Sequence, residues 1–323
     1  MTFDLGRVIS RAFGITWRHR WLWLLGVFGG AGVGGNYSYN TDSGRGGRTS
    51  GQVGQFMAGH IALVLAVVAI VLVIVVVAFV VSCIAVPASI WAGLQLDAGR
   101  DVTLGTAWRQ GRARGWRYFR LALLKGLISL GVVVVVGVMV ALGAALYAAA
   151  GSGIIPLLVI GGILLVLLLV AALIALSFGL LWSDRMLVIL ELGAADSIRA
   201  GWWLVRHEKG NTFLFAVVFG IVKFVVSLAV LLAAAVIAIP GIILVIVFFT
   251  NPGATTALAI VGFLWLALLG GGAFLVGAGF VGALTQVGYA IAGRDLAIVK
   301  GMQVRPEVIG WDPYAAPAPA PAT

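Results

Sequence analysis

Lys223 is the residue whose type and position most suggest chemistry in this 323-residue sequence. It lies well inside the apolar run 213–250, and a lysine near the centre of a bilayer costs roughly 2.5–3.5 kcal/mol. Facing a polar cavity, such a cation would bind an anion or a lipid phosphate. Ser227, one helical turn further on, would share its face. The alternative is that the ammonium snorkels to the membrane surface and has no specific role.

Four arginines form a second group of candidate anion contacts. The segment that begins at Trp108 carries them, and the apolar run 121–150 follows it directly. The four are Arg109, Arg112, Arg117 and Arg120. Because arginine and tryptophan collect where a helix leaves the hydrocarbon on the cytoplasmic side, this junction indicates a membrane surface. We expect these arginines to contact anionic lipid head groups.

Three carboxylates in one polar segment, Asp184, Glu191 and Asp196, could serve acid–base or metal chemistry. Arginines such as Arg185 and Arg199 balance them within the same stretch, so we expect salt-bridged and solvated helices instead. The histidines are isolated on different segments and have no metal-ligand spacing. Because no nucleophile lies beside a base, the sequence predicts a protein that is not an enzyme and holds no metal or cofactor.

Two stretches match the pattern Gly-x-Gly-x-x-Gly, at 30–35 and 277–282. Both lie in apolar helical runs, whereas a dinucleotide site needs a preceding strand and a helix that begins in water. Small residues four positions apart instead let two membrane helices approach closely. The candidate packing residues are Gly26, Gly30, Gly34, Gly277 and Gly282.

Composition places the chain among polytopic membrane proteins. It is 62% hydrophobic and 10% charged, whereas soluble domains carry roughly 45–50% apolar and about 25% charged residues. The net charge of +10 lies mainly at the ends of apolar runs, which favours anionic lipid over nucleic acid as the partner. We expect one all-α integral domain over 1–295 and a largely disordered Ala/Pro-rich cytoplasmic tail over 296–323.

About six spans are expected, as a transmembrane helical bundle of three hairpins that each follow a cytoplasmic interfacial amphipathic helix. The spans are 21–35, 61–86, 121–150, 154–182, 213–237 and 257–281. Pro240 is expected to break the long fifth run, which leaves 238–250 as a re-entrant or interfacial piece. Lys125, close to the start of the third span, is expected to snorkel.

Most lysines and arginines fall on one side of this arrangement, and only Arg45 and Arg48 fall on the other. The positive-inside rule then places both termini in the cytoplasm of a bacterial-type cell membrane. The single cysteine, Cys83, lies within an apolar run, so no intramolecular disulfide is possible.

Three segments share one plan, in which Ala12, Ala107 or Ala200 precedes a stretch rich in tryptophan and arginine and then an apolar run. An internal three-fold repeat would explain this likeness. The alternative is convergence, because every inner membrane boundary collects tryptophan and arginine.

The third of these segments also carries an Ala-x-x-Ser-x-x-x-x-Trp motif, formed by Ala194, Ser197 and Trp202, with a weaker echo over 4–23. An interfacial helix, a hairpin and then this motif resemble the bacterial membrane domain found attached to glycerophosphoryl diester phosphodiesterases. The resemblance covers roughly 1–295 and implies a helical membrane module. We expect no phosphodiesterase barrel after the last span, so the resemblance assigns no catalytic residue. Related stand-alone proteins have no known activity.

The sequence therefore predicts an accessory or interaction module whose basic cytoplasmic face binds anionic lipid or a partner, which could be another protein or a second copy of the chain. The alternative is a transporter or channel for a small anion or lipid that uses Lys223, with support from the break at Pro240 and the possible repeat. An intramembrane enzyme has the least support, because the spans offer almost no polar residues that converge at one depth.

Overall fold

The computed structural model describes residues 3–30, 61–150, 155–250, 256–302 and 304. Within these ranges the chain forms helices joined by short connections and contains no strand. The helices are α1 (Leu5–Arg18), α2 (Trp21–Gly30), α4 (Ile61–Asp97), α5 (Leu104–Ala150), α6 (Ile155–Ile189), α7 (Ala194–His207), α8 (Lys209–Thr250), α9 (Thr256–Trp265), a π-helical turn η2 (Leu266–Gly270) and α10 (Gly271–Val299). The expected all-α class is confirmed for this part of the chain.

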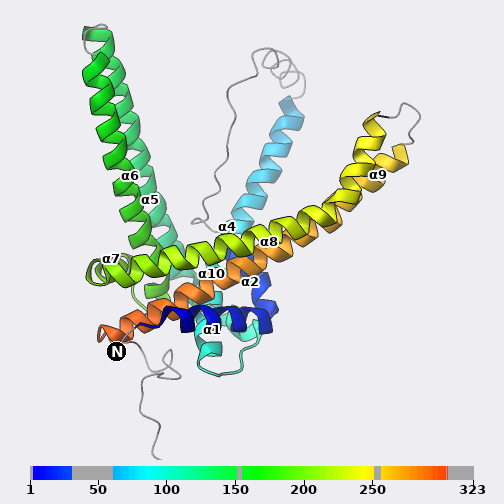
Figure 1. Ribbon diagram of the computed structural model, residues 1–323, viewed down its shortest axis with the longest axis horizontal. Helices are drawn as coiled ribbons and strands as arrows, with labels where there is room; N and C mark the ends of the chain where they lie inside the picture. Colours follow the sequence, from blue (N-terminus) through cyan, green and yellow to red (C-terminus); the bar gives the residue numbers. More distant parts are fainter. Residues whose placement is uncertain (1–2, 31–60, 151–154, 251–255, 303, 305–323) are drawn as a thin grey trace, which may run out of the picture.

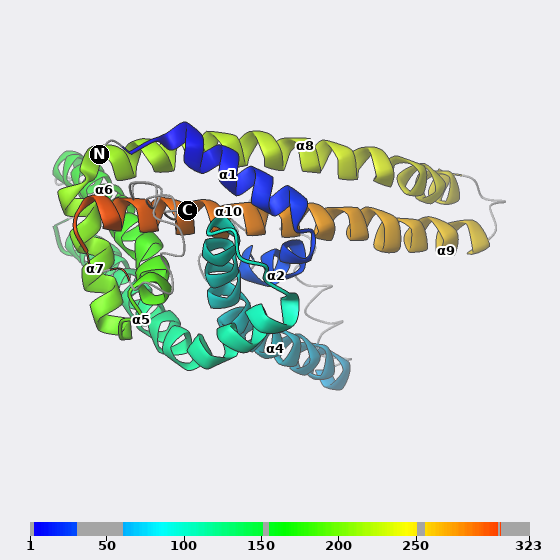
Figure 2. The same ribbon diagram turned by 90° about the horizontal axis from the view of Figure 1, so that it is seen from below.

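The long helices converge at one end of the molecule and diverge toward the other (Figure 1). The α5–α6 hairpin and the hairpin of α8 with α9, η2 and α10 point in different directions, and α4 projects between them. Seen from below, α8 runs beside α9 and α10, while α1, α2 and α7 lie around the converging ends (Figure 2). We call this converging end the base. The buried core lies there, and α10 contacts α1, α2, α4, α6 and α8.

Five helices are long and apolar enough to cross a membrane: α4, α5, α6, α8 and the continuous unit of α9, η2 and α10. Away from the base their side chains are largely exposed, for example Val133, Leu168 and Phe224. Exposure of so many apolar side chains to water is unfavourable, whereas their contact with lipid is favourable. At 1.5 Å per residue the 47 residues of α5 span about 70 Å, more than twice a hydrocarbon core, so only part of α5 can lie within it.

The structure describes residues 21–30 of the first expected span, 21–35, and they form helix α2. It packs at the base against α10 and α4, and residues 31–35 of the expected span lie outside the described ranges. The described part of the chain therefore supports five long apolar helices.

The expected break at Pro240 is wrong, because α8 continues through this residue to Thr250. Proline cannot donate a backbone hydrogen bond to the carbonyl four residues earlier. Next to that carbonyl, the indole nitrogen of Trp265 donates to the carbonyl of Ile237 at 2.8 Å. A neighbouring helix thus supplies hydrogen bonding around the proline, as membrane helices tolerate, and 238–250 continues α8 as helix.

Three other helices continue past the ends of the expected spans 61–86, 154–182 and 257–281 into the buried base. Helix α4 passes through Pro87 to Asp97, and α6 extends to Ile189. Helix α10 extends to Val299, so the first residues of the expected disordered tail, 296–299, are helical. Side chains pack on all sides at the base, and this packing holds polar residues in helices that hydropathy alone assigns to loops. Residues 305–323 lie outside the described part of the chain.

Close glycine contacts join α2 to α10. A Cβ atom added to Gly26 would lie 2.0 Å from the carbonyl oxygen of Gly279, and one added to Gly282 would lie 2.2 Å from that of Gly26. Gly277 faces α8 instead, where an added Cβ would overlap the side chain of Val230. Of the other candidate packing glycines, Gly30 is the last residue of α2 and Gly34 lies outside the described ranges.

Replacing Gly282 by leucine is expected to destabilise the base by about 3 kcal/mol, the upper range for overpacking, because the new side chain meets backbone atoms of α2. The matched control is Gly137→Leu in α5, where nothing lies within 4 Å of an added Cβ. The apparent melting temperature of the detergent-purified protein should fall for Gly282→Leu and stay unchanged for Gly137→Leu. Equal melting temperatures would contradict the contact.

Candidate functional site

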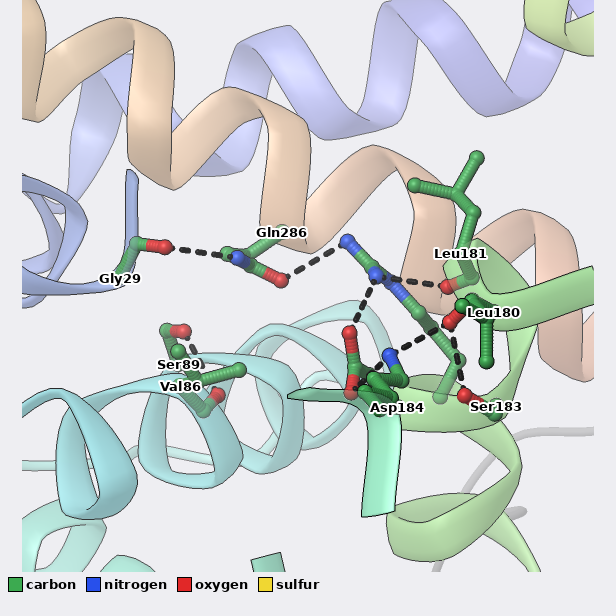
Figure 3. A network of polar contacts seen from close by, with 10 residues as sticks. Gly29, Val86, Ser89, Leu180, Leu181, Ser183, Asp184 and Gln286 are labelled. Carbon is green, nitrogen blue, oxygen red and sulfur yellow. Dashed lines mark hydrogen bonds and ion pairs between the residues drawn. The ribbon is translucent and has the colours of Figure 1, made fainter. Parts of the chain in front are cut away.

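A polar network that includes Asp184 of α6 and Gln286 of α10 lies buried where the hairpins diverge (Figure 3), and Arg185 of α6 contacts both residues. The side chain of Arg185 is 3% exposed. Its Nη2 donates to Oε1 of Gln286 in α10 at 2.9 Å, and its Nη1 donates to the carbonyl of Leu181 at 2.8 Å. The guanidinium also lies over the ring of Tyr289, 5.2 Å from its centroid. A buried guanidinium with these partners fixes the position of α6 against α10.

Asp184 joins this network to α5. One of its carboxylate oxygens lies 2.7 Å from Nζ of Lys125, and the other lies 3.3 Å from Nη1 of Arg185. Lys125 also donates to the carbonyl of Leu180, so the expectation that it snorkels is wrong. The ion pair with Asp184 and the hydrogen bond to Leu180 offset the cost of removing the Lys125 ammonium from water. The side chain therefore does not need to extend to the membrane surface.

Gln286 extends the network to α2, because its Nε2 donates to the carbonyl of Gly29 at 3.2 Å (Figure 3). Side chains from α5, α6 and α10 and a backbone group from α2 therefore meet at one level. Of these polar side chains only Lys125 lies within an expected span, because Asp184, Arg185 and Gln286 follow the ends of the spans 154–182 and 257–281. The solvated helix expected for Asp184 is wrong, because its side chain is 14% exposed.

The charged groups of this network already bind one another, which limits the chemistry that the network can perform. Both carboxylate oxygens of Asp184 are held by cations, so neither oxygen is left without a partner. Two cations against one carboxylate give a net positive charge. Within the described residues, no group of three His, Cys, Asp or Glu side chains could hold a metal ion. The network therefore stabilises the packing of α5, α6 and α10 against one another.

A second buried ion cluster joins α1, α4 and α10 at the base. Arg294, fully buried, donates to Asp97 at 2.7 Å and to Asp295 at 2.8 Å. Arg11 of α1 approaches the same oxygen of Asp97 at 3.6 Å. Each carboxylate lies beside a guanidinium, so the charges compensate one another inside the core.

The connection between α6 and α7 is held by α5. Glu191 has a positive φ of 52°, a conformation that costs energy in a residue with a Cβ. Its carboxylate lies 2.6 Å from Nη2 of Arg114, and its carbonyl accepts a hydrogen bond from Arg117 at 3.2 Å. These contacts stabilise the strained connection and place α7 against the first part of α5.

The candidate arginines lie on the first part of α5, and all four side chains are exposed. Arg109, Arg112 and Arg120 share one face with Trp116, at helical spacings of three and four residues. The guanidinium of Arg120 lies 5.1 Å from the centroid of the Trp116 ring. Arg117 is turned toward the α6–α7 connection. We call Arg109, Arg112, Trp116 and Arg120 the α5 stripe.

The opposite face of this part of α5 carries a stripe that the sequence analysis missed. Ala107, Gly111 and Gly115 are buried against α4, and an added Cβ on Gly111 would lie 2.4 Å from the carbonyl of Ile84. The signal was present as three small residues at intervals of four. It was missed because the arginines between them identify the segment as surface.

Lys223 is not brought together with another site residue. Its side chain is exposed on α8, and none of the hydrogen bonds or ion pairs within the described ranges involves it. Ser227 is partly buried one turn further along. Neither cavity found in the described structure is lined by Lys223.

The Ala-x-x-Ser-x-x-x-x-Trp residues pack α7 against α6. Ser197 is buried and donates to the carbonyl of Gly193 at 2.7 Å, which holds the first turn of α7. An added Cβ on Gly179 would lie 2.3 Å from the ring of Trp202, and one added to Gly201 would lie 2.8 Å from the backbone nitrogen of Ser183. The motif therefore positions a surface helix by packing.

Comparison with known proteins gives one family. Residues 12–292 match the Family of unknown function (DUF7544). No curated protein and no solved structure matches the chain. Nothing in these comparisons links the chain to the membrane domain of glycerophosphoryl diester phosphodiesterases, so that resemblance contributes no argument to the proposed function.

Asp184→Asn is expected to destabilise the fold by about 3 kcal/mol, because it leaves Lys125 and Arg185 without their carboxylate in a buried site. The double variant Lys125→Gln/Asp184→Asn restores the original net charge and should be less destabilised than the single variant. Asp196→Asn, at an exposed carboxylate, is the control and should change stability by less than about 0.5 kcal/mol. Unfolding in mixed detergent micelles measures all three. A double variant at least as unstable as Asp184→Asn would contradict the coupling.

A surface pair provides a prediction of pH dependence. Glu208, which lies between α7 and α8, contacts Nζ of Lys300 at 2.5 Å, and this hydrogen bond holds the pKa of Glu208 below its usual value. A lowered folded-state pKa contributes stability above the ordinary glutamate value of about 4.3, and this contribution is lost as pH falls through the folded value. The melting-temperature gap between wild type and Lys300→Gln should be constant near neutral pH and shrink below about pH 4. A constant gap down to pH 3 would contradict the pair.

Proposed function

Because the chain belongs to this family of unknown function, we propose its role from its own geometry: an accessory or interaction module of the cell membrane. We use the name basic rim for the exposed arginines and tryptophans of α1, α7 and the start of α5. This rim faces the cytoplasm and binds the head groups of anionic lipids. The single observation that carries this proposal is the α5 stripe, which is cationic, aromatic and exposed, and which continues directly into an apolar helix.

The position of the stripe along α5 supports binding to head groups. Arg120 is exposed, and Leu123 and Leu127 directly after it are exposed apolar residues in the same unbroken helix. A straight helix that changes from guanidinium groups to leucine within one turn fits a boundary between head groups and hydrocarbon. Trp116, which is 61% exposed, adds an amphipathic ring of the kind that prefers this level.

The other surface helices present the same chemistry. In α1, Trp17 is exposed beside Arg18, and in α7, Trp203 is exposed near Arg206. Both helices lie at the base with the start of α5 (Figures 1 and 2). A base surrounded by exposed arginine and tryptophan supports the proposed cytoplasmic orientation, with both termini on that side.

The alternative of transport through Lys223 gains little from the structure. A transport site lies in a cavity between repeats, whereas Lys223 is exposed on α8 and lines neither of the two cavities described in this structure. The cations between the hairpins, Lys125 and Arg185, are already bound to Asp184. Lys223 is exposed, and Lys125 and Arg185 are paired with Asp184. Both observations favour the accessory role.

Replacing Arg109, Arg112, Arg117 and Arg120 together by glutamine is expected to reduce the enrichment of anionic lipid around the protein several-fold. Each basic residue near an anionic surface contributes about 1 kcal/mol. The protein is purified in nanodiscs made from phosphatidylglycerol and phosphatidylcholine, and retained lipid is quantified by mass spectrometry. The wild-type enrichment should also decline in about 1 M salt, where the Debye length is near 3 Å.

Lys223→Gln is the control and should retain wild-type enrichment. Loss of enrichment in Lys223→Gln, with none in the fourfold variant, would favour the alternative and reject the role proposed for the arginines.

A further inference from the structure

An apolar crevice of about 420 Å³ opens between α6 and the start of α8, where the two hairpins begin to separate. Ile174, Ala175 and Phe178 of α6 line one side. The other side is formed by the end of α7 and the first residues of α8: Val205, Lys209, Gly210, Thr212 and Phe213. Its volume lies within the range of about 300–1,000 Å³ that is typical of ligand pockets.

Lys209, which lines this crevice, is a cation without a counter-ion within the described residues. Lys209 is exposed, and its ammonium takes part in no hydrogen bond or ion pair within the described residues. The adjacent carboxylate cannot neutralise it, because one oxygen of Glu208 binds Lys300 at 2.5 Å and the other accepts from Asn211 at 2.7 Å. The crevice therefore combines an apolar channel with one available positive charge.

The order of these groups fits a lipid that lies along the helices. Lys209 lies two residues after the end of α7, whose Trp203 and Arg206 belong to the basic rim. Ile174 lies one helical turn before Phe178 on α6, farther from the base. The rings of Phe178 and Phe213 stack across the crevice with centroids 6.0 Å apart. The cation thus lies at the proposed head-group level and the apolar wall extends toward the hydrocarbon.

We propose that this crevice is a binding site for one acyl chain of an anionic phospholipid, whose phosphate contacts Lys209. The site rests on the proposed function for its leaflet and orientation. It shares no residue with the α5 stripe, so it would hold an individual lipid, whereas the stripe contacts head groups collectively. The amide hydrogens of the first turn of α8 add positive potential near the phosphate.

The test is a titration of the full chain in detergent with phosphatidylglycerol, followed by native mass spectrometry. Ala175→Trp fills the crevice from α6, and Gly210→Leu fills it from α8, where nothing lies within 4 Å of an added Cβ. Lys209→Gln removes the cation. Each variant should weaken the tightest-bound phosphatidylglycerol about tenfold, while Ser177→Trp and Arg199→Gln, which lie outside the crevice, should leave it unchanged.

Head-group dependence separates the two parts of the site. Wild type should bind phosphatidylcholine about as weakly as Lys209→Gln binds phosphatidylglycerol, and Lys209→Gln should no longer distinguish the two lipids. Wild-type affinity in both crevice-filling variants, with melting temperatures intact, would overturn the proposal. So would loss of the tightest lipid in the fourfold arginine variant alone. Retention of the tightest lipid in the fourfold variant, together with unchanged collective enrichment, would reject the proposed role of the arginines and leave the crevice supported.

Discussion

The ion pair between Lys125 and Asp184, extended by Arg185 and Gln286, is the interaction on which the arrangement of helices depends. It lies where four helices stop packing against one another and begin to diverge. Hydrophobic packing in lipid gives little preference for one helix over another, because a lipid tail is as apolar as a leucine side chain. Directional contacts such as Arg185 to Gln286, at 2.9 Å, therefore determine which helices meet and at what level.

Around this junction, each surface helix is fixed by a buried stripe that opposes its exposed arginines. In α5 the stripe is formed by small residues, in α7 it includes Ser197 and Gly201, and in α1 it is Val8, Ala12 and Thr16. The first part of α5 packs on α4, α7 packs on α6, and α1 packs on α10. The same plan thus operates three times, whatever its origin, and it holds the basic residues outward around one end of the molecule.

Sequence reasoning found what depends on hydropathy and missed what depends on helix contacts. The run at 121–150 and the exposed arginines before it could be predicted, because transfer free energy is a property of each residue. The pairing of Lys125 with Asp184 could not, since 59 positions separate the partners and each alone suggests a surface residue. Pro240 was misjudged for a similar reason, as the donor near it, Trp265, comes from another helix. The crevice beside Lys209 depends on an inter-helix angle that no local pattern encodes.

The seating of α1 on α10 has a consequence for biogenesis. A ribosome completes the first helix long before the last, yet Val8 and Ala12 become buried only when α10 is present. Until then Asp97 has Arg11 but lacks Arg294, its closer partner. The insertion intermediate must keep α1 at the membrane surface, which its amphipathic character permits. Docking of α1 on α10 is therefore a late assembly step, and chains that stall before α10 would expose the buried face of α1 to quality-control proteases.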